Sequence, residues 1–228
     1  MTYSEFKSII LNEFPPLEEI QYSNFEKLEN LYKEWNSKIN VISRKDIDQV
    51  YRHHILHSLA IAAYIKRELA ETFNEFLNGI DKRSQKRIKI LDLGTGGGFP
   101  GIPLAILFPN IEFTLCDSVG KKIIVASEVA KALNLTNVSC VNARAESIKE
   151  DFDYVVSRAV TSLDKFMPWV KGKYRKGILY LKGGDVVEEI ALTMGQFKLR
   201  PGSVNVWKIN NWLNDIYFDE KLVIHIEA

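Results

Sequence analysis

The sequence lacks the features that mark secreted, membrane-spanning or metal-binding proteins. Its 228 residues include two cysteines, Cys116 and Cys140, without CxxC or zinc-type spacing. We therefore expect two reduced thiols in a cytoplasmic protein. No apolar run approaches the roughly 20 residues that a membrane-spanning helix needs. The first residues do not resemble a signal peptide, because no basic start leads into an apolar stretch.

An excess of charge of one sign is also missing, since the formal net charge is only +1. Bulk charge therefore does not indicate a nucleic-acid-binding protein. Two short stretches are nevertheless basic, at residues 82–89 and 171–176. Each stretch can either contact phosphates or form a solvated face beside a strand, and the charge pattern leaves both readings open.

Glycine is absent before Gly79, and the chain up to residue 85 has the periodicity of helices. Apolar residues recur at helical spacing between Phe25 and Ile39 and again from about residue 47 to 69. The Pro15-Pro16 pair interrupts this pattern early and separates a first short helix. We predict an N-terminal helical extension over residues 1–85.

From residue 86 to 228, short apolar runs alternate with helical segments. This alternation predicts an α/β domain with a parallel sheet covered on both faces. The last two strand candidates have no helix between them, which predicts an antiparallel hairpin at the sheet edge. A doubly wound, Rossmann-like, mostly parallel sheet with a C-terminal hairpin is the outline of class I methyltransferases. The strand candidates are 88–93, 112–117, 138–142, 154–158, 178–182, 204–209 and 221–226, and the helix candidates lie near 101–108, 119–134, 161–170 and 185–195.

Glycines cluster at residues 94–98, directly after the first predicted strand of this domain. Glycine lets the backbone turn sharply and approach a ligand closely, and α/β folds bind cofactors at the carboxyl ends of their strands. The second predicted strand ends at Asp117, whose carboxylate can accept hydrogen bonds from a ribose diol. We therefore expect Gly94, Gly96, Gly98 and Asp117 to bind a nucleoside-containing cofactor.

The prolines of this loop separate two candidate cofactors. Residues 96–101 and Asp117 together match the fingerprint of a nicotinamide dinucleotide site. A pyrophosphate, however, needs free amides at the helix N-terminus, and Pro100 and Pro103 remove two of them. S-adenosylmethionine carries no phosphate, and Asp92 suits its cationic methionine moiety. We favour S-adenosylmethionine over a dinucleotide, and a purely structural glycine loop is the weakest alternative.

Several short blocks spread over most of the chain occur together in one known family. The blocks are Trp35-Asn36-x-x-x-Asn40, His54-Ile55-Leu56-x-Ser58, Asp92-x-Gly94-Thr95-Gly96-x-Gly98-Phe99-Pro100-Gly101-Ile102-Pro103-Leu104, Asp117-Ser118-x-x-Lys121-Lys122, Arg144-Ala145-Glu146, Ser157-Arg158-Ala159 and Leu181-Lys182-Gly183. Together they resemble the bacterial ribosomal RNA small subunit methyltransferase G family, also called glucose-inhibited division protein B. The family usually has arginine and aspartate where this chain has His53 and His57.

The resemblance implies transfer of a methyl group from S-adenosylmethionine to N7 of one guanosine in the 530 loop of 16S rRNA. It implies 16S rRNA or the small ribosomal subunit as the partner, and we expect a cytoplasmic monomer with no membrane contact. By motif, the implied cofactor contacts are Gly94, Phe99, Ala145, Glu146 and Arg158. The candidate substrate-binding residues are Asn40, His54, Lys121, Lys122, Arg158 and Lys182.

This chemistry needs no general base, because guanine N7 has a lone pair and no proton. We expect positioning to dominate, with Arg158 and Lys182 at the strand ends holding RNA or orienting the cofactor carboxylate. Lys182 is otherwise an exposed strand-end lysine. His53 and His57 have a spacing that suits zinc, but no third ligand accompanies them, so we expect no metal. Two other functions stay open, a small-molecule methyltransferase and a non-catalytic, cofactor-binding ribosome assembly factor.

Overall fold

The N-terminal part of the chain is helical, as its periodicity predicts. A computed structural model describes all residues 1–228. The Pro15-Pro16 pair lies between the first two helices, and the second predicted helix consists of three consecutive pieces with a π-helical turn in the middle. The elements are α1 (Tyr3–Glu13), α2 (Glu19–Lys38), the 3-10 turn η1 (Ile47–Gln49), the π-helix η2 (Val50–Leu56), α3 (His57–Glu68) and α4 (Ala70–Asn78).

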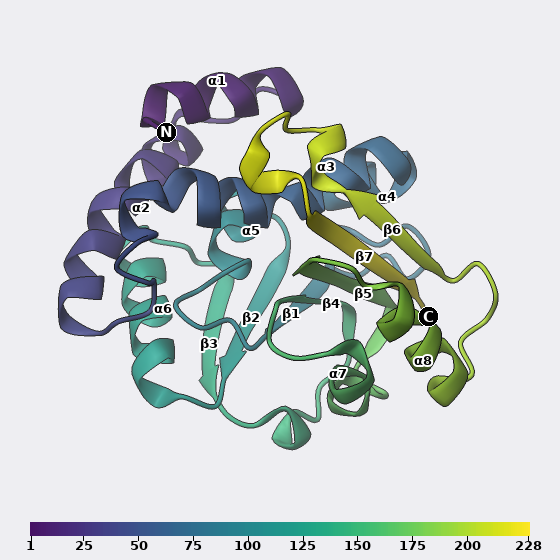
Figure 1. Cartoon of the computed structure of the whole chain (residues 1–228). Helices are drawn as coiled ribbons and strands as arrows, with labels where there is room; N and C mark the ends of the chain where they lie inside the picture. The colour runs from purple at the N-terminus through teal and green to yellow at the C-terminus, as the bar shows by residue number, and fades with distance from the viewer.

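Seven strands form one sheet in the order β3-β2-β1-β4-β5-β7-β6. The first five strands are parallel, and β7 runs antiparallel between β5 and β6. The predicted parallel sheet with a terminal hairpin is therefore confirmed (Figure 1). The strands are β1 (Lys89–Leu93), β2 (Glu112–Asp117), β3 (Val138–Asn142), β4 (Phe152–Arg158), β5 (Tyr174–Gly183), β6 (Val204–Lys208) and β7 (Lys221–Glu227). The connecting elements are α5 (Gly101–Leu107), α6 (Gly120–Ala132), η3 (Ala145–Ser147), α7 (Leu163–Val170), α8 (Val187–Phe197), η4 (Ile209–Asn211) and η5 (Ile216–Phe218).

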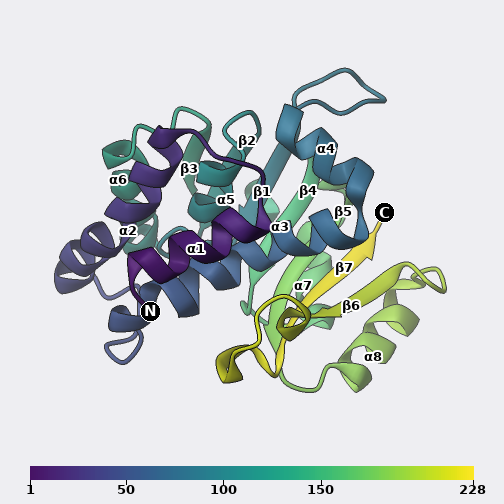
Figure 2. The ribbon, with the colours of Figure 1, turned by 90° about the horizontal axis from the view of Figure 1, so that it is seen from above.

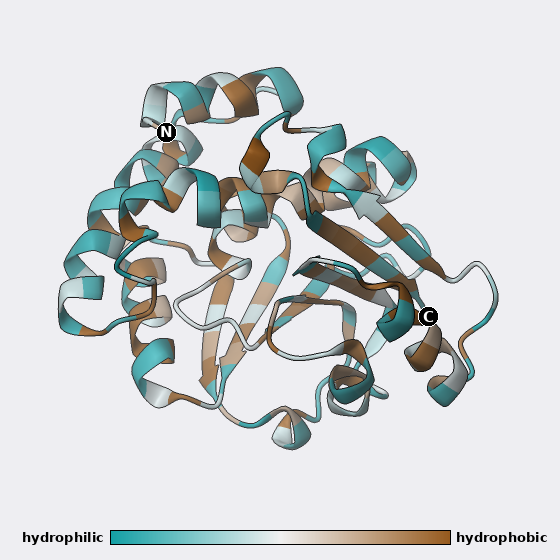
Figure 3. Ribbon diagram, viewed as in Figure 1, coloured by the Kyte–Doolittle hydropathy of each residue, from teal (hydrophilic) through white to brown (hydrophobic).

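Hydrophobic cores lie on both faces of the sheet, because neighbouring residues of a strand point to opposite sides. In β4, Val156 belongs to the core shared with α3 and α5, and Val155 belongs to the core shared with α7. In Figure 1, α3 lies above the sheet and α7 below it, and Figure 2, seen from above, shows α1 and α3 in front of the strands. In Figure 3 the apolar colour concentrates on the strands, and the outer surfaces of the helices are largely hydrophilic.

The helical extension packs directly on the sheet domain and shares its larger core. The ring of Phe6 lies 5.3 Å from that of Phe25 and 5.0 Å from that of Tyr51, which joins α1, α2 and η2. Gln21 of α2 then reaches α5, where its amide nitrogen donates to the carbonyl of Ile106 at 2.7 Å. None of the helices combines the length and apolarity that crossing a membrane requires.

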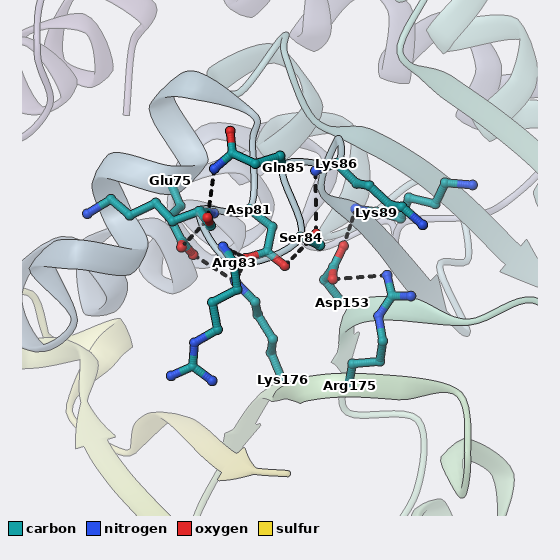
Figure 4. A network of polar contacts seen from close by, with 11 residues as sticks. Glu75, Asp81, Arg83, Ser84, Gln85, Lys86, Lys89, Asp153, Arg175 and Lys176 are labelled. Carbon is teal, nitrogen blue, oxygen red and sulfur yellow. Dashed lines mark hydrogen bonds and ion pairs between the residues drawn. The ribbon is translucent and has the colours of Figure 1, made fainter.

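Ion pairs join α4 and the loop after it to the amino end of β5 (Figure 4). Lys176 Nζ lies 2.8 Å from a carboxylate oxygen of Glu75 and 3.0 Å from one of Asp81. Arg175 pairs with the buried carboxylate of Asp153 at 3.1 Å. β5 begins at Tyr174, which pairs with Phe152 of β4, rather than at the predicted residue 178. Arg175 and Lys176, whose charges suggest a loop in the sequence, are thus strand residues with acidic partners elsewhere in the chain.

Candidate functional site

A cavity of about 590 Å³ opens at the carboxyl ends of the first four strands. Cofactor sites lie at this edge in doubly wound α/β folds. Five of the residues expected to bind a cofactor line the cavity, and they come from the ends of four different strands. They are Gly94, Asp117, Ala145, Glu146 and Arg158.

The glycine loop turns through a conformation that a side chain would obstruct. Gly94 has a φ of +73°, and a Cβ atom there would lie 2.5 Å from a methyl group of Val160. A Cβ on Gly97 would lie 2.8 Å from a methyl group of Val41, which belongs to the loop after α2. The loop is therefore confined between the segment after β4 and the helical extension, and glycine is required for both contacts.

Asp117 links the glycine loop to the end of β2. Its side chain is 8% exposed, and its two oxygens accept from the amides of Gly96 at 2.9 Å and Val119 at 2.8 Å. A carboxylate can accept about four hydrogen bonds, so this one retains acceptor capacity while lining the cavity. Asp117 can thus order the loop and still receive hydroxyl donors from a ligand.

Arg158 brings its guanidinium to the cavity, where its polar partners are His53 and His54 and it forms no ion pair with a carboxylate. It contacts the Nδ1 atom of His54 at 2.9 Å and donates to the carbonyl of His53 at 3.4 Å. Since arginine cannot accept, His54 Nδ1 must be the unprotonated acceptor. Burial, followed by the positive charge of Arg158, lowers the pKa of His54 to about 3, which agrees with that assignment.

Phe99 does not line the cavity; its ring packs against the Arg158 guanidinium on the side of the core. Its side chain is 3% exposed, and its ring lies 4.6 Å from that of Tyr32 and 5.0 Å from the Arg158 guanidinium carbon. The Tyr32 hydroxyl donates to the carbonyl of Gly97 at 2.9 Å. Helix α2 therefore holds both the glycine loop and Phe99, and nothing in the sequence pattern distinguished Tyr32 from other core residues.

Asp92, whose charge we expected to suit a cationic methionine moiety, is not among the residues that line the cavity. It is fully buried, and one carboxylate oxygen accepts from the Thr95 hydroxyl at 2.6 Å and the Gly101 amide at 2.7 Å. Burial raises its pKa to about 7. The acid closes the glycine loop from within the core, because the loop supplies the only donors that reach it.

The remaining predicted residues are distributed around the rim or away from it. Lys122 lines the cavity, whereas Lys121 and Asn40 are exposed. Lys182 is not an exposed strand-end lysine, since it forms an ion pair with Glu189. Gly96 and Gly98 belong to the loop but not to the cavity lining.

The histidines with zinc-like spacing have protein partners instead. His53 Nδ1 lies 2.8 Å from a carboxylate oxygen of Asp46, and the His53 ring stacks on Tyr217 at 3.9 Å. His57 is buried against Tyr217 and Phe218. No group of three or more histidine, cysteine, aspartate or glutamate side chains is arranged to hold a metal ion.

The two basic stretches flank the amino ends of the strands, opposite the cavity. Residues 82–89 lead into β1, and residues 171–176 lead into β5. Several of their cations have acidic partners, including Lys176, Arg175 and Arg87, the last of which lies 3.5 Å from Glu112. Of the two readings that the charge pattern leaves open, these positions favour a charged face beside a strand over phosphate contacts at the cavity.

Structural neighbours agree with the strand order. The magnesium protoporphyrin IX methyltransferase of Synechocystis PCC 6803, solved with bound SAM, superposes with a TM-score of 0.59 at 10% identity, over 94% of this chain and 99% of that one. M. jannaschii TYW2 in complex with AdoMet superposes with a TM-score of 0.53 at 15% identity, over 84% of this chain and 78% of that one. The fold is that of a class I methyltransferase.

The sequence comparisons are more specific. The family model described as rRNA small subunit methyltransferase G matches residues 21–210. A ribosomal RNA small subunit methyltransferase G of Flavobacterium psychrophilum is 48% identical over 95% of this chain and 96% of its own length. One of Porphyromonas gingivalis is 43% identical over 96% and 92%. The chain belongs to the rRNA small subunit methyltransferase G family.

Proposed function

We propose that this protein transfers a methyl group from S-adenosylmethionine to N7 of a single guanosine in the 530 loop of 16S rRNA. Membership of the rRNA small subunit methyltransferase G family is the observation that carries the proposal. The N7 position and the 530 loop come from the block resemblance of residues such as Asp92–Leu104. We further propose that the protein acts in the cytoplasm as a monomer, on 16S rRNA or the small ribosomal subunit.

The cavity fits the cofactor in chemistry. Asp117 has acceptor capacity for a ribose diol, and Val119 and Ala145 offer apolar surface for a base. The Arg158 guanidinium, which has no carboxylate partner in the protein, suits the carboxylate of the methionine moiety. When bound, S-adenosylmethionine supplies an electrophilic methyl group on a sulfonium.

The protein's own contribution is to bind and orient the two reactants. Guanine N7 attacks with its lone pair, so no side chain has to take a proton. Holding the two reactants in line converts a bimolecular encounter into an effectively unimolecular step. His54 and Phe99 fix the guanidinium of Arg158 from two sides. Tyr32 and Asp92 hold the glycine loop from beneath.

Cations without acidic partners support docking of RNA at the carboxyl edge of the sheet. Lys121 and Lys122 begin α6 beside Asp117, and Arg144 follows β3. Arg44 and Lys45 are exposed on the loop that covers Gly97 through Val41. No carboxylate lies within 4.0 Å of these five side chains, so each is available to a phosphate. The list of candidate RNA contacts is Arg44, Lys45, Lys121, Lys122 and Arg144.

The test is methylation of small subunits from a strain that lacks this activity, with labelled S-adenosylmethionine and purified protein. We expect label in 16S rRNA, with borohydride- and aniline-dependent chain scission at one guanosine of the 530 loop, the signature of N7-methylguanosine. Free 16S rRNA serves as a parallel substrate. Label elsewhere, or none on either substrate, contradicts the proposal.

A further inference from the structure

A strained turn follows β4 and forms part of the cavity wall. Ala159 has a φ of +47°, a left-handed conformation that costs energy for a residue with a Cβ atom. Its amide donates to the carbonyl of Leu181 in β5 at 3.0 Å. Ala159 and Val160 both line the cavity, directly after Arg158. Strain of this kind persists only where surrounding contacts enforce it.

The hydroxyl group of Tyr180 enforces the turn. It accepts from the amide of Val160 at 3.0 Å and from that of Thr161 at 3.1 Å, and it donates to the carbonyl of Thr161 at 2.7 Å. A tyrosine hydroxyl has one donor and two acceptor positions, so all three are in use. The ring is fully buried in β5 and packs against Phe166 at 4.8 Å between centroids. The hydroxyl is thus held at a fixed point below the turn.

This turn places the side chain of Val160 against the glycine loop. The Val160 methyl groups occupy the space beside Gly94, where a Cβ atom would lie 2.5 Å from the nearer methyl. Val160 remains 38% exposed, so its other side faces the cavity. Ala159 and Val160 therefore form a wall of the cavity beside Arg158, and the position of this wall depends on the turn.

We propose that Tyr180 is a positioning residue for methyl transfer, whose hydroxyl holds residues 159–161 as the wall against which the two reactants are aligned. The inference rests on the proposed function and deepens it. Tyr180 does not line the cavity, and Arg158 is anchored separately by His53 and His54. Loss of the hydroxyl should therefore affect the rate of transfer more than cofactor affinity.

The test compares Tyr180→Phe with Tyr154→Phe. Tyr154 is a matched control, because it is also buried, lies in the neighbouring strand β4, and lines a separate cavity at the amino edge. We expect Tyr180→Phe to lower kcat on small subunits about tenfold, as a misplaced reactant would. The dissociation constant of S-adenosylhomocysteine should change less than about threefold, and Tyr154→Phe should leave both values near those of the wild type.

A second variant keeps the test decisive if Tyr180→Phe does not fold. Val160→Ala trims the wall at a partly exposed position and leaves the Tyr180 hydrogen bonds intact, so we expect lower kcat with an unchanged Tm. The inference is overturned if folded Tyr180→Phe keeps wild-type kcat, or if Val160→Ala does so when Tyr180→Phe is unfolded. Failure of the proposed function is a different result, because the wild type itself would then not methylate rRNA.

Discussion

Cations lie at both ends of the sheet, but those that line the cavity differ in their partners from those at the start of β5. At the amino end, Lys176 and Arg175 have carboxylate partners within about 3 Å, and these pairs join β5 to α4 and to β4. At the carboxyl end, Arg158, Lys122 and Arg144 line the cavity without any carboxylate within 4.0 Å. Paired charges hold the fold, whereas unpaired charges at a cavity are available to a ligand.

The largest expected effect is the loss of activity on substitution of Arg158, which tests most directly the contrast between unpaired and paired cations. Arg158→Ala removes the unpaired guanidinium, so we expect kcat/KM to fall by about a hundredfold, as for other preorganised electrostatic groups. Affinity for S-adenosylhomocysteine should fall as well. Arg175→Ala is the matched control at the amino end and should keep kcat/KM within about twofold. Equal losses in both variants would break the comparison.

The second effect concerns stability at the amino end. Lys176→Met leaves Glu75 and Asp81, both largely buried, without their shared counter-charge. We expect the free energy of unfolding to fall by about 2 kcal/mol in urea titrations. Lys82→Met, at an exposed position in the same segment, should change it by less than about 0.5 kcal/mol. A Lys176→Met variant as stable as the wild type would show that the ion pairs do not hold this end.

The pH dependence of the same pair is a further check. Burial raises the pKa of Asp81, but hydrogen bonds from the Arg83 amide and the Ser84 hydroxyl, followed by Lys176, outweigh it and lower the pKa to about 2, below the unfolded value of about 3.9. Because the pKa of Asp81 is lower in the folded state, its ionised form stabilises the fold at pH values above the unfolded pKa. This contribution to the free energy of unfolding is lost as the pH falls through the folded pKa. The difference between wild type and Asp81→Asn should therefore shrink between about pH 4 and pH 2.

A third effect separates the two ends by salt dependence. Lys121→Gln combined with Lys122→Gln should weaken binding of the 530-loop RNA and reduce the slope of log K against log salt by about 1.4, at about 0.7 per phosphate contact. Lys82→Gln with Arg83→Gln removes two adjacent, exposed cations at the amino end. That control should leave the slope unchanged, and an equal reduction would mean that both ends contact RNA.

The smallest expected effect is at Asp92, below the glycine loop. Burial raises its folded pKa to about 7, above the unfolded value of about 3.9. The folded state therefore binds more protons than the unfolded state in this interval, and stability falls as the pH rises from about 4 to 7. Asp92→Asn keeps an oxygen for Thr95 and Gly101. Its stability relative to wild type should increase over that interval, as measured by urea unfolding at several pH values.

Much of the fold was predictable because it depends on local periodicity. The alternation of apolar strands and helices defines the parallel sheet, and the bounds of β2 and β3 agree with those predicted. The start of β5 was not predictable, since Arg175 and Lys176 look like a loop until their acidic partners are known. The position of the cavity could likewise be predicted from Gly94 and Asp117. Tyr32 and Tyr180, in contrast, carry no sequence signal that separates them from other buried aromatic residues.

The sequence by itself determined the class of fold, the glycine loop with its prolines and the family blocks, because each depends on residues close together in the chain. The tertiary structure alone decided which charges are paired, and it alone shows that Asp92 is buried and bonded to the glycine loop. The reason is the range of the interactions: Lys176 and Glu75 are 101 positions apart, and Arg158 and His54 are 104 apart. Such partners meet only after the sheet and the extension have packed together.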